Sequence, residues 1–320
     1  MSIGSFLKLV EIQTKIASMT PFLLGSIFAV YRYNQFSLSN FIMMFISLLS
    51  FDMATTAINN YIDYKKASKT HGYGYERHNA IVRDNLKEST VIAVIVALLA
   101  IAVAFGILLF LNTSLLVLVI GVISFAVGIL YTFGPIPISR MPLGEMFSGL
   151  FMGFVIIFLA TYIHIVDLNL FELSLANSIL ILNIDLYELL VLFLIALPAT
   201  LGIAVIMLAN NICDIEDDLE NKRYTLPIYI GKAKALKLFK ALYYITFADI
   251  VVLLLLGILP LITIPALLTV IPVKKNIDLF MKLQSKKDTF VVAIKNFVLI
   301  NASLVILLLG SGLSNLPSII

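Results

Sequence analysis

The chain has 320 residues, of which 61% are hydrophobic and only 13% are charged, and its formal net charge is +3. A soluble domain averages about one-quarter charged residues, so this composition excludes an ordinary water-soluble protein. The single cysteine, Cys213, excludes an intramolecular disulfide and a cysteine-ligated metal cluster, and no nucleic-acid partner is expected.

Hydrophobic runs of roughly 18 to 25 residues recur along the chain, and each is long enough to cross a bilayer as a helix. The pattern predicts an all-α membrane protein with nine transmembrane helices. In chain order the spans cover residues 15–34, 40–62, 90–111, 114–133, 143–166, 187–213, 235–256, 258–273 and 289–311. The eighth contains Pro260 and Pro265 and is expected to be kinked or tilted. No removable signal peptide is predicted.

The basic residues segregate to one side of this topology. Of the 22 lysines and arginines, 21 fall on one face, and Arg32 is the exception. This excess marks that face as cytoplasmic. The chain is therefore expected to lie in the cell membrane with its N-terminus inside and its C-terminus outside. Loops 64–89 and 214–234 are predicted to be cytoplasmic, and the external loop 167–186 is interpreted as a connector.

A short polar motif occurs twice, each time where a hydrophobic span meets a basic loop. Asn59, Asn60 and Asp63 end the second span, and Asn210, Asn211 and Asp214 end the sixth, followed by Asp218. Four spans separate the copies, so both have the same orientation. The chain is interpreted as one domain over residues 1–320, with parallel half-repeats at about 15–133 and 143–273 and a ninth helix at 289–311. The two motifs are expected to face each other across a central cavity.

The residue types in these motifs indicate a divalent cation. Asp214 and Asp218 are four residues apart and share a helix face, where like charges repel unless a cation holds them together. Each motif alone could equally be a solvated or capping polar cluster, but the repetition favours a site. Mg²⁺ prefers oxygen ligands and bridges carboxylates to phosphate. The predicted metal ligands are Asn59, Asn60, Asp63, Asn210, Asn211, Asp214 and Asp218, with Asp63, Asp214 and Asp218 as the catalytic carboxylates.

Nearby basic residues are candidates for binding a diphosphate group. Lys222, Arg223, Arg83 and Lys66 are predicted to pair with its oxygens, although they could also anchor the loops to anionic lipid. A hydrophobic bundle beside such a site suits a substrate with a diphosphate head and a long isoprenoid tail. Further along, Gly149 and Gly153 have the G-x-x-x-G spacing, which favours a helix-packing seam over a site.

Four segments carry a family resemblance: residues 59–66, 131–135, 143–147 and 211–231. Through them the chain resembles the UbiA superfamily of intramembrane prenyltransferases, and within it the branch acting on 1,4-dihydroxy-2-naphthoate in menaquinone biosynthesis. The resemblance implies nine helices around a central cavity in the lipid bilayer. It also implies Mg²⁺-dependent transfer of a polyprenyl group from polyprenyl diphosphate to dihydroxynaphthoate, with loss of carbon dioxide and diphosphate, giving a demethylmenaquinone precursor. Tyr131 and Glu145 flank a Pro-rich turn and are candidates to meet the acceptor, with a structural role in the turn as the alternative.

The first motif departs from the family pattern. Where the family usually has Asn-Asp, this chain has Asn59-Asn60, and Lys69 stands where a further Asp commonly follows. Asp63 is then the only carboxylate of the motif, and Glu76, Asp84 or Glu88 could substitute for the missing ones.

Other readings remain open. Another aromatic acceptor, such as 4-hydroxybenzoate or homogentisate, would require only a different pocket geometry. A secondary transporter is a more distant alternative, because transporter sites typically lie near the midplane on broken helices, whereas these polar clusters end their spans.

Overall fold

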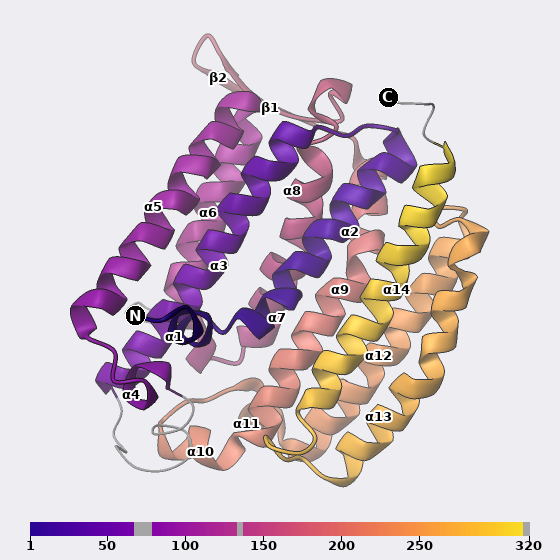
Figure 1. Ribbon diagram of the computed structural model, residues 1–320. Coiled ribbons are helices and arrows are strands. Elements are labelled where there is room, and N and C mark those ends of the chain that lie inside the picture. The colour runs from indigo at the N-terminus through magenta and orange to yellow at the C-terminus, as the bar shows by residue number, and fades with distance from the viewer. Residues whose placement is uncertain (67–78, 133–136, 316–320) are drawn as a thin grey trace. The chain divides into compact units, whose positions relative to one another are not determined.

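The computed structural model of the protein describes residues 1–66, 79–132 and 137–315. The chain divides into two compact units. Unit 1 comprises Met1–Met19 and Leu38–Pro135, and unit 2 comprises Thr20–Ser37 and Ile136–Ile320. Each unit is built mainly of helices (Figure 1). The division into two half-repeats stays a prediction.

Unit 1 is organised around α3 and α5, which pack against each other. Ala57 of α3 and Val91 of α5 are completely buried in one cluster with Leu9. The Ser47 hydroxyl donates a 2.8 Å hydrogen bond to the Ala102 carbonyl and so ties the two helices together in a hydrophobic setting. The elements of the unit are α1 (Ile3–Leu9), η1 (Ile12–Lys15), α3 (Leu38–Lys66), α4 (Ala80–Arg83), α5 (Glu88–Asn112) and α6 (Leu115–Thr132), and α2 (Ile16–Tyr33) begins in it and continues into unit 2.

Unit 2 is organised around α9, which packs against α12, α14, α7 and the π-helical turn η4. The first half of the unit contains η3 (Ile138–Arg140), α7 (Gly144–Ser148), η4 (Gly149–Val155), α8 (Ile156–Tyr162), η5 (Val166–Leu168), β1 (Phe171–Ala176), β2 (Ile179–Ile184) and α9 (Leu186–Cys213). The second half contains α10 (Ile215–Glu220), α11 (Leu226–Ile230), α12 (Lys232–Leu255), η6 (Leu261–Thr269), α13 (Val270–Lys282) and α14 (Val291–Asn315).

The glycines of the G-x-x-x-G pair let η4 approach α9 closely. A Cβ on Gly149 would lie 2.7 Å from the Thr200 carbonyl oxygen, and one on Gly153 would lie 2.5 Å from the Thr200 Cα. Any larger residue would collide with backbone at both positions. The predicted packing seam is therefore confirmed, and it holds the helix bearing Glu145 against the helix that ends in the second motif.

The predicted spans coincide with helical structure. In the described part of the chain, seven helices are long and apolar enough to cross a membrane, and α6 is a shorter apolar helix. The eighth predicted span is irregular, as its prolines indicate: a 3₁₀ helix starts after Pro260 and continues as α13. The all-α membrane class is confirmed, whereas the count of nine crossings stays a prediction.

The loop at 167–186 contains a feature that the sequence analysis did not predict. Strands β1 and β2 form an antiparallel hairpin in which Phe171 pairs with Ile184 and Ala176 pairs with Ile179. Asn177 and Ser178 make the two-residue turn, and both have positive φ angles, as a tight hairpin requires.

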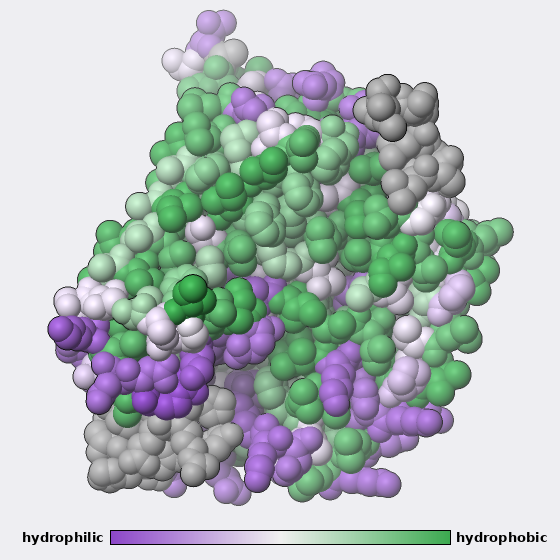
Figure 2. All heavy atoms as spheres, in the orientation of Figure 1, coloured by the Kyte–Doolittle hydropathy of each residue, from purple (hydrophilic) through white to green (hydrophobic). Residues whose placement is uncertain are grey.

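The surface of unit 2 separates by polarity. On the face shown in Figure 2, hydrophobic side chains predominate along α14, and hydrophilic side chains gather at the end that holds α10 and α11. The exposed apolar residues include Ile306 and Leu309 of α14 and Leu255 of α12. Such exposure is expected of helices that face lipid, because lipid replaces the protein core as their apolar environment.

Candidate active site

The second motif lies where α9 ends. The helix stops at Cys213, Asp214 follows as its cap, and α10 begins at Ile215. The Asp214 amide donates to the Asn210 carbonyl at 3.1 Å, and the Asp218 amide donates to the Asp214 carbonyl at 2.7 Å. These four-residue steps keep Asn210, Asp214 and Asp218 on successive turns, as their spacing predicts.

Two oxygens of this motif converge on one cation. The Lys286 ammonium donates to Asn210 Oδ1 and to Asp214 Oδ2, and Asn210 Nδ2 also donates to Asp214 Oδ2 at 3.3 Å. Lys286 comes from the loop between α13 and α14, 72 residues after Asp214. Sequence reasoning did not select Lys286, because its only signal was membership of a basic loop on the same side of the predicted topology.

Asp218 is held in a more buried setting. Its side chain accepts a 3.2 Å hydrogen bond from the buried Thr225 hydroxyl, and its other oxygen lies 3.3 Å from Arg223 Nε in an ion pair. Burial raises the pKa of Asp218, the negative charge of Asp214 adds to the rise, and Arg223 and Thr225 oppose it. The guanidinium of Arg223 also donates to the Ser139 carbonyl at 3.3 Å.

Glu145, predicted to meet the acceptor, contacts the second motif directly. Asn211 Nδ2 donates a 2.8 Å hydrogen bond to Glu145 Oε1, and both side chains are buried. Through this bond α7 positions the amide of the motif. Tyr131 lies half-buried near the end of α6 in unit 1. Lys222 is exposed just after α10, with a φ of 54°. The acceptor and diphosphate roles stay predictions.

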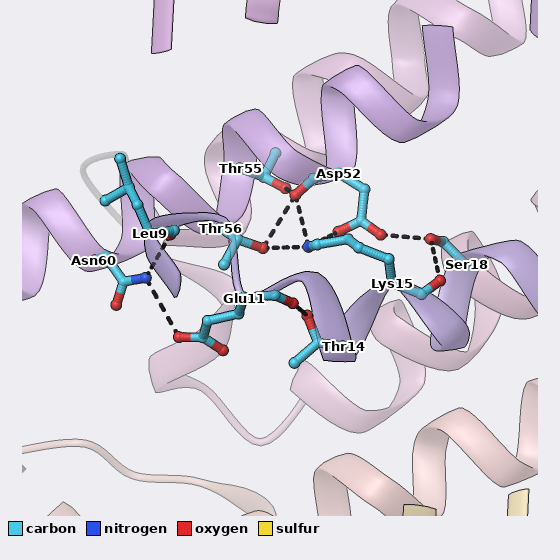
Figure 3. Close-up of polar contacts among 9 residues, drawn as sticks. All are labelled: Leu9, Glu11, Thr14, Lys15, Ser18, Asp52, Thr55, Thr56 and Asn60. Atoms are coloured by element: carbon cyan, nitrogen blue, oxygen red, sulfur yellow. Dashed lines mark hydrogen bonds and ion pairs between the residues drawn. The ribbon is translucent and has the colours of Figure 1, made fainter. Parts of the chain in front are cut away.

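The first motif lies on α3 and is tied to the N-terminal segment. Asn60 Nδ2 donates to the Leu9 carbonyl at 2.9 Å and contacts Glu11 Oε1 at 3.3 Å (Figure 3). Asn59 is half-buried, and Asp63 is exposed on the same helix. Glu11 thus brings to this motif a carboxylate that the sequence analysis missed, because 49 residues separate it from Asn60. Metal binding by Asn59, Asn60 and Asp63 stays a prediction.

A buried ion pair lies earlier in α3, before the first motif. The Lys15 ammonium donates to Asp52 Oδ1 at 2.6 Å, to the Asp52 carbonyl at 3.0 Å and to the Thr56 hydroxyl at 2.6 Å (Figure 3). The Ser18 hydroxyl donates to Asp52 Oδ2. Lys15 is 3% exposed, so all its donors are used within unit 1.

The basic and acidic residues after α3 are engaged with one another. Arg83 Nε donates to Asp84 Oδ1 at 3.0 Å, and hydrogen bonds from Ser5 and Arg83 lower the pKa of Asp84. Glu88 accepts from the Tyr61 hydroxyl at 2.5 Å and from Lys65 at 2.8 Å. The remaining candidates are Lys66, the last residue of α3, and Glu76, which lies outside the described residues.

Residues 18–297 match the model of the UbiA prenyltransferase family. The chain belongs to this family. It is 33% identical over 260 residues to the 1,4-dihydroxy-2-naphthoate octaprenyltransferase of Bacillus subtilis (strain 168), covering 80% of this chain and 76% of the relative. The predicted family is thus confirmed, and the protein is a membrane-embedded prenyltransferase.

Solved structures of UbiA homologues share the fold. The apo homologue from Aeropyrum pernix K1 has a TM-score of 0.67 at 19% identity, covering 92% of this chain and 98% of the other. The Archaeoglobus fulgidus homologue bound to DMAPP and Mg²⁺ has a TM-score of 0.64 at 16% identity, covering 98% of this chain and 100% of the other.

The second motif of this UbiA family member has donors suited to Mg²⁺. Among the described residues, no group of three or more His, Cys, Asp or Glu side chains is placed to hold a metal. Mg²⁺ needs few protein ligands, however, because it retains waters and binds substrate phosphate. The oxygens of Asn210 and Asp214 already converge on a cation, the Lys286 ammonium, so this donor set fits.

Proposed function

We propose that this enzyme transfers a polyprenyl group from polyprenyl diphosphate to 1,4-dihydroxy-2-naphthoate, releasing diphosphate and carbon dioxide. The observation that carries the proposal is the convergence of Asn210 and Asp214 oxygens on one cationic position, one helical turn from the buried Asp218. The acceptor follows from the Bacillus subtilis relative, whose name specifies dihydroxynaphthoate. The product would be a demethylmenaquinone precursor.

The protein's part in the reaction begins with charge. Asn210, Asp214 and Asp218 would hold Mg²⁺, which when bound helps to neutralise the leaving diphosphate. Lys222 and Arg223 follow α10 directly and would pair with the remaining diphosphate oxygens. Fixed charges of this kind act on the charge that develops as the allylic C–O bond breaks, where they are most effective.

The bond changes balance without an additional reactant. Diphosphate leaves with the electron pair of the broken C–O bond, and the ring carbon that bears the carboxylate forms the new C–C bond. Carbon dioxide then departs, and its bonding pair restores the aromatic ring. Phe and Tyr faces can stabilise the intervening allylic cation, and the site must exclude water so that the acceptor, not water, captures it.

We propose the same membrane orientation as the basic residues predict. The second motif would lie at the cytoplasmic side of the cell membrane. There the water-soluble products of the reaction, diphosphate and carbon dioxide, can leave. The apolar faces of α12 and α14 would remain in lipid, which also supplies the hydrophobic substrate.

A competition assay tests the acceptor. Purified protein receives Mg²⁺, one prenyl diphosphate and equal concentrations of dihydroxynaphthoate, 4-hydroxybenzoate and homogentisate, and products are identified by mass. A second aromatic ring buries roughly 50–80 Å², or about 1–2 kcal/mol, which supports about a tenfold preference. We expect dihydroxynaphthoate to react fastest, with one carbon dioxide released for each prenylated naphthoate-derived product.

An Asp214→Ala preparation purified in parallel controls for contaminating enzymes. Faster formation of prenylated 4-hydroxybenzoate would reject the naphthoate acceptor while leaving prenyl transfer intact. Absence of any prenylated ring, with substrates recovered unchanged, would reject the proposed reaction as a whole.

A further inference from the structure

Lys286 binds the side chains of the motif that we propose as a metal site. Its ammonium donates to Asn210 Oδ1 and Asp214 Oδ2, the two oxygens that converge at the end of α9. A lysine has three donors and no acceptor, so it can bind these oxygens only as a competitor of another cation. The ammonium and a metal cation cannot use the same oxygen lone pairs. Their positive charges also repel each other.

The loop that carries Lys286 is ordered by its own hydrogen bonds. The Ser285 amide donates to the Thr289 hydroxyl at 2.9 Å, the Ser285 hydroxyl donates to Asp288 at 2.8 Å, and the Thr289 amide returns to the Ser285 carbonyl at 3.0 Å. Gln284 adds a bond to the Phe280 carbonyl at the end of α13. These bonds tie the loop to the end of α13, and rotation of the lysine side chain is enough to move the ammonium.

The environment permits that rotation. The side chain of Lys286 is 46% exposed, whereas that of Asp214 is 21% exposed. The ammonium also lies 5.3 Å from the centroid of the Phe290 ring, a contact that adds modest stabilisation without burying the charge. A half-exposed ion pair contributes little net free energy, so a divalent cation that binds the same oxygens can displace it.

We propose that Lys286 is the resting counter-cation of the second motif and becomes a diphosphate ligand once a divalent metal displaces it. This inference rests on the proposed function, because it assumes that Asn210 and Asp214 bind metal. Without metal, the lysine neutralises Asp214 and keeps the two oxygens oriented. After metal binds, the released ammonium lies beside the metal-bound diphosphate and pairs with its oxygens.

The proposal predicts opposite effects of one substitution on two ligands. Lys286→Ala removes the competitor, so the full-length protein in detergent should bind Mn²⁺ alone about fivefold more tightly, the equivalent of one partly exposed ion pair. The same variant should bind pyrophosphate about fivefold more weakly at saturating Mn²⁺, because one ligand is lost. Mn²⁺ is followed by electron paramagnetic resonance and pyrophosphate by calorimetry, so neither measurement depends on turnover.

Two matched variants separate this role from others. Lys287→Ala removes the same charge from the next residue, which is exposed, and should change neither affinity by more than about twofold. Lys286→Arg keeps a cation and should stay near wild type for both ligands. If Lys286 had only a structural role, Lys286→Ala would instead lower the affinities for Mn²⁺ and for pyrophosphate together.

The outcomes distinguish the inference from the proposed function. Equal or weaker Mn²⁺ binding by Lys286→Ala, in a protein whose wild type binds Mn²⁺ and whose Asp214→Ala variant does not, overturns the counter-cation role. If Lys286→Ala binds pyrophosphate as tightly as wild type does, Lys286 is not a diphosphate ligand. If wild type and Asp214→Ala bind Mn²⁺ identically, the metal site of the proposed function itself is wrong.

Discussion

Asp217 and Asp218 are adjacent in the chain, yet they differ in what they can bind. Asp218 is 3% exposed and is held by Thr225 and Arg223. Asp217 is exposed, and its backbone carbonyl accepts from the side chain of Asn221. One helical step separates the two side chains by about 100°, which turns Asp218 toward Thr225 and Arg223 and leaves Asp217 in solvent. The surroundings of each residue, more than its type, therefore decide which of the two carboxylates we propose as a metal ligand.

We expect Asp63→Ala, Asp214→Ala and Asp218→Ala each to lower the turnover number for prenyl transfer by at least about 10²-fold, since each removes charge stabilisation from the leaving diphosphate. Asp217→Ala should lose far less activity because its side chain faces solvent. Product formation is measured at saturating substrates, with size-exclusion profiles to verify folding. If Asp217 proves as sensitive as Asp214, the assignment of helix faces is wrong.

Residue-scale prediction worked where the signal was local. The spacing of Asn210, Asp214 and Asp218 was enough to place them on successive turns, and the four-residue hydrogen bonds keep that spacing across the junction of α9 and α10. The partners that complete the two motifs could not be found this way. Lys286 is 72 residues from Asp214, and Glu11 is 49 residues from Asn60. Contacts of that kind depend on tertiary packing, which a single sequence pattern does not encode.

At the scale of elements, α9 determines the geometry of unit 2. Both glycines of η4 pack against Thr200, near the middle of α9, and the second motif lies at the end of α9. A π-helical turn within the facing helix is a frequent mark of a functional region, because it re-aims the side chains beside it. Here the helix of that turn also carries Glu145, which binds Asn211. Packing at the seam therefore controls the position of the motif.

Gly153→Ala should destabilise the protein strongly. The new Cβ would lie 2.5 Å from the Thr200 Cα, and overpacking of this kind costs typically about 1–3 kcal/mol. We expect a lower melting temperature in detergent, measured by intrinsic fluorescence. Gly121→Ala is the matched control, because a Cβ there meets nothing within 4 Å. A Gly153→Ala protein as stable as the Gly121→Ala protein would show that the seam is not tightly packed.

The long elements were predictable and the short ones were not. Each predicted span coincides with helical structure because a long hydrophobic run has few other solutions in a membrane. The hairpin β1–β2, the one-turn helix α4 and the break between α9 and α10 have no such signal. Short elements are stabilised mainly by their neighbours, so their sequences alone do not specify them.

At the scale of the whole molecule, the charge distribution has one exception, and the structure accounts for it. Arg32, the single basic residue predicted on the external side, donates to both carboxylate oxygens of Glu188 at 2.6 and 2.8 Å. The Tyr33 hydroxyl donates to the same carboxylate at 2.6 Å. The charge of Arg32 is therefore neutralised locally and does not oppose the orientation that the other 21 basic residues predict.

Cysteine labelling tests that orientation. In a Cys213→Ser background, Lys87→Cys and Lys222→Cys should react with a membrane-impermeant maleimide only from the cytoplasmic side of sealed vesicles, since both residues are exposed in basic loops. Asn177→Cys, in the hairpin turn, should react only from the opposite side. Labelling of positions 87 and 222 from different sides would overturn the topology.

The ion pair between Lys15 and Asp52 has a consequence for biogenesis. The two residues belong to the first two candidate membrane spans, Ile12–Tyr33 and Leu38–Lys65. A lone charge within a span costs about 2.5–3.5 kcal/mol during insertion. Because only 37 residues separate Lys15 from Asp52, the pair can form while the rest of the chain is still being synthesised. We therefore expect the first two spans to enter the bilayer together, with each charge already matched before the third span leaves the ribosome.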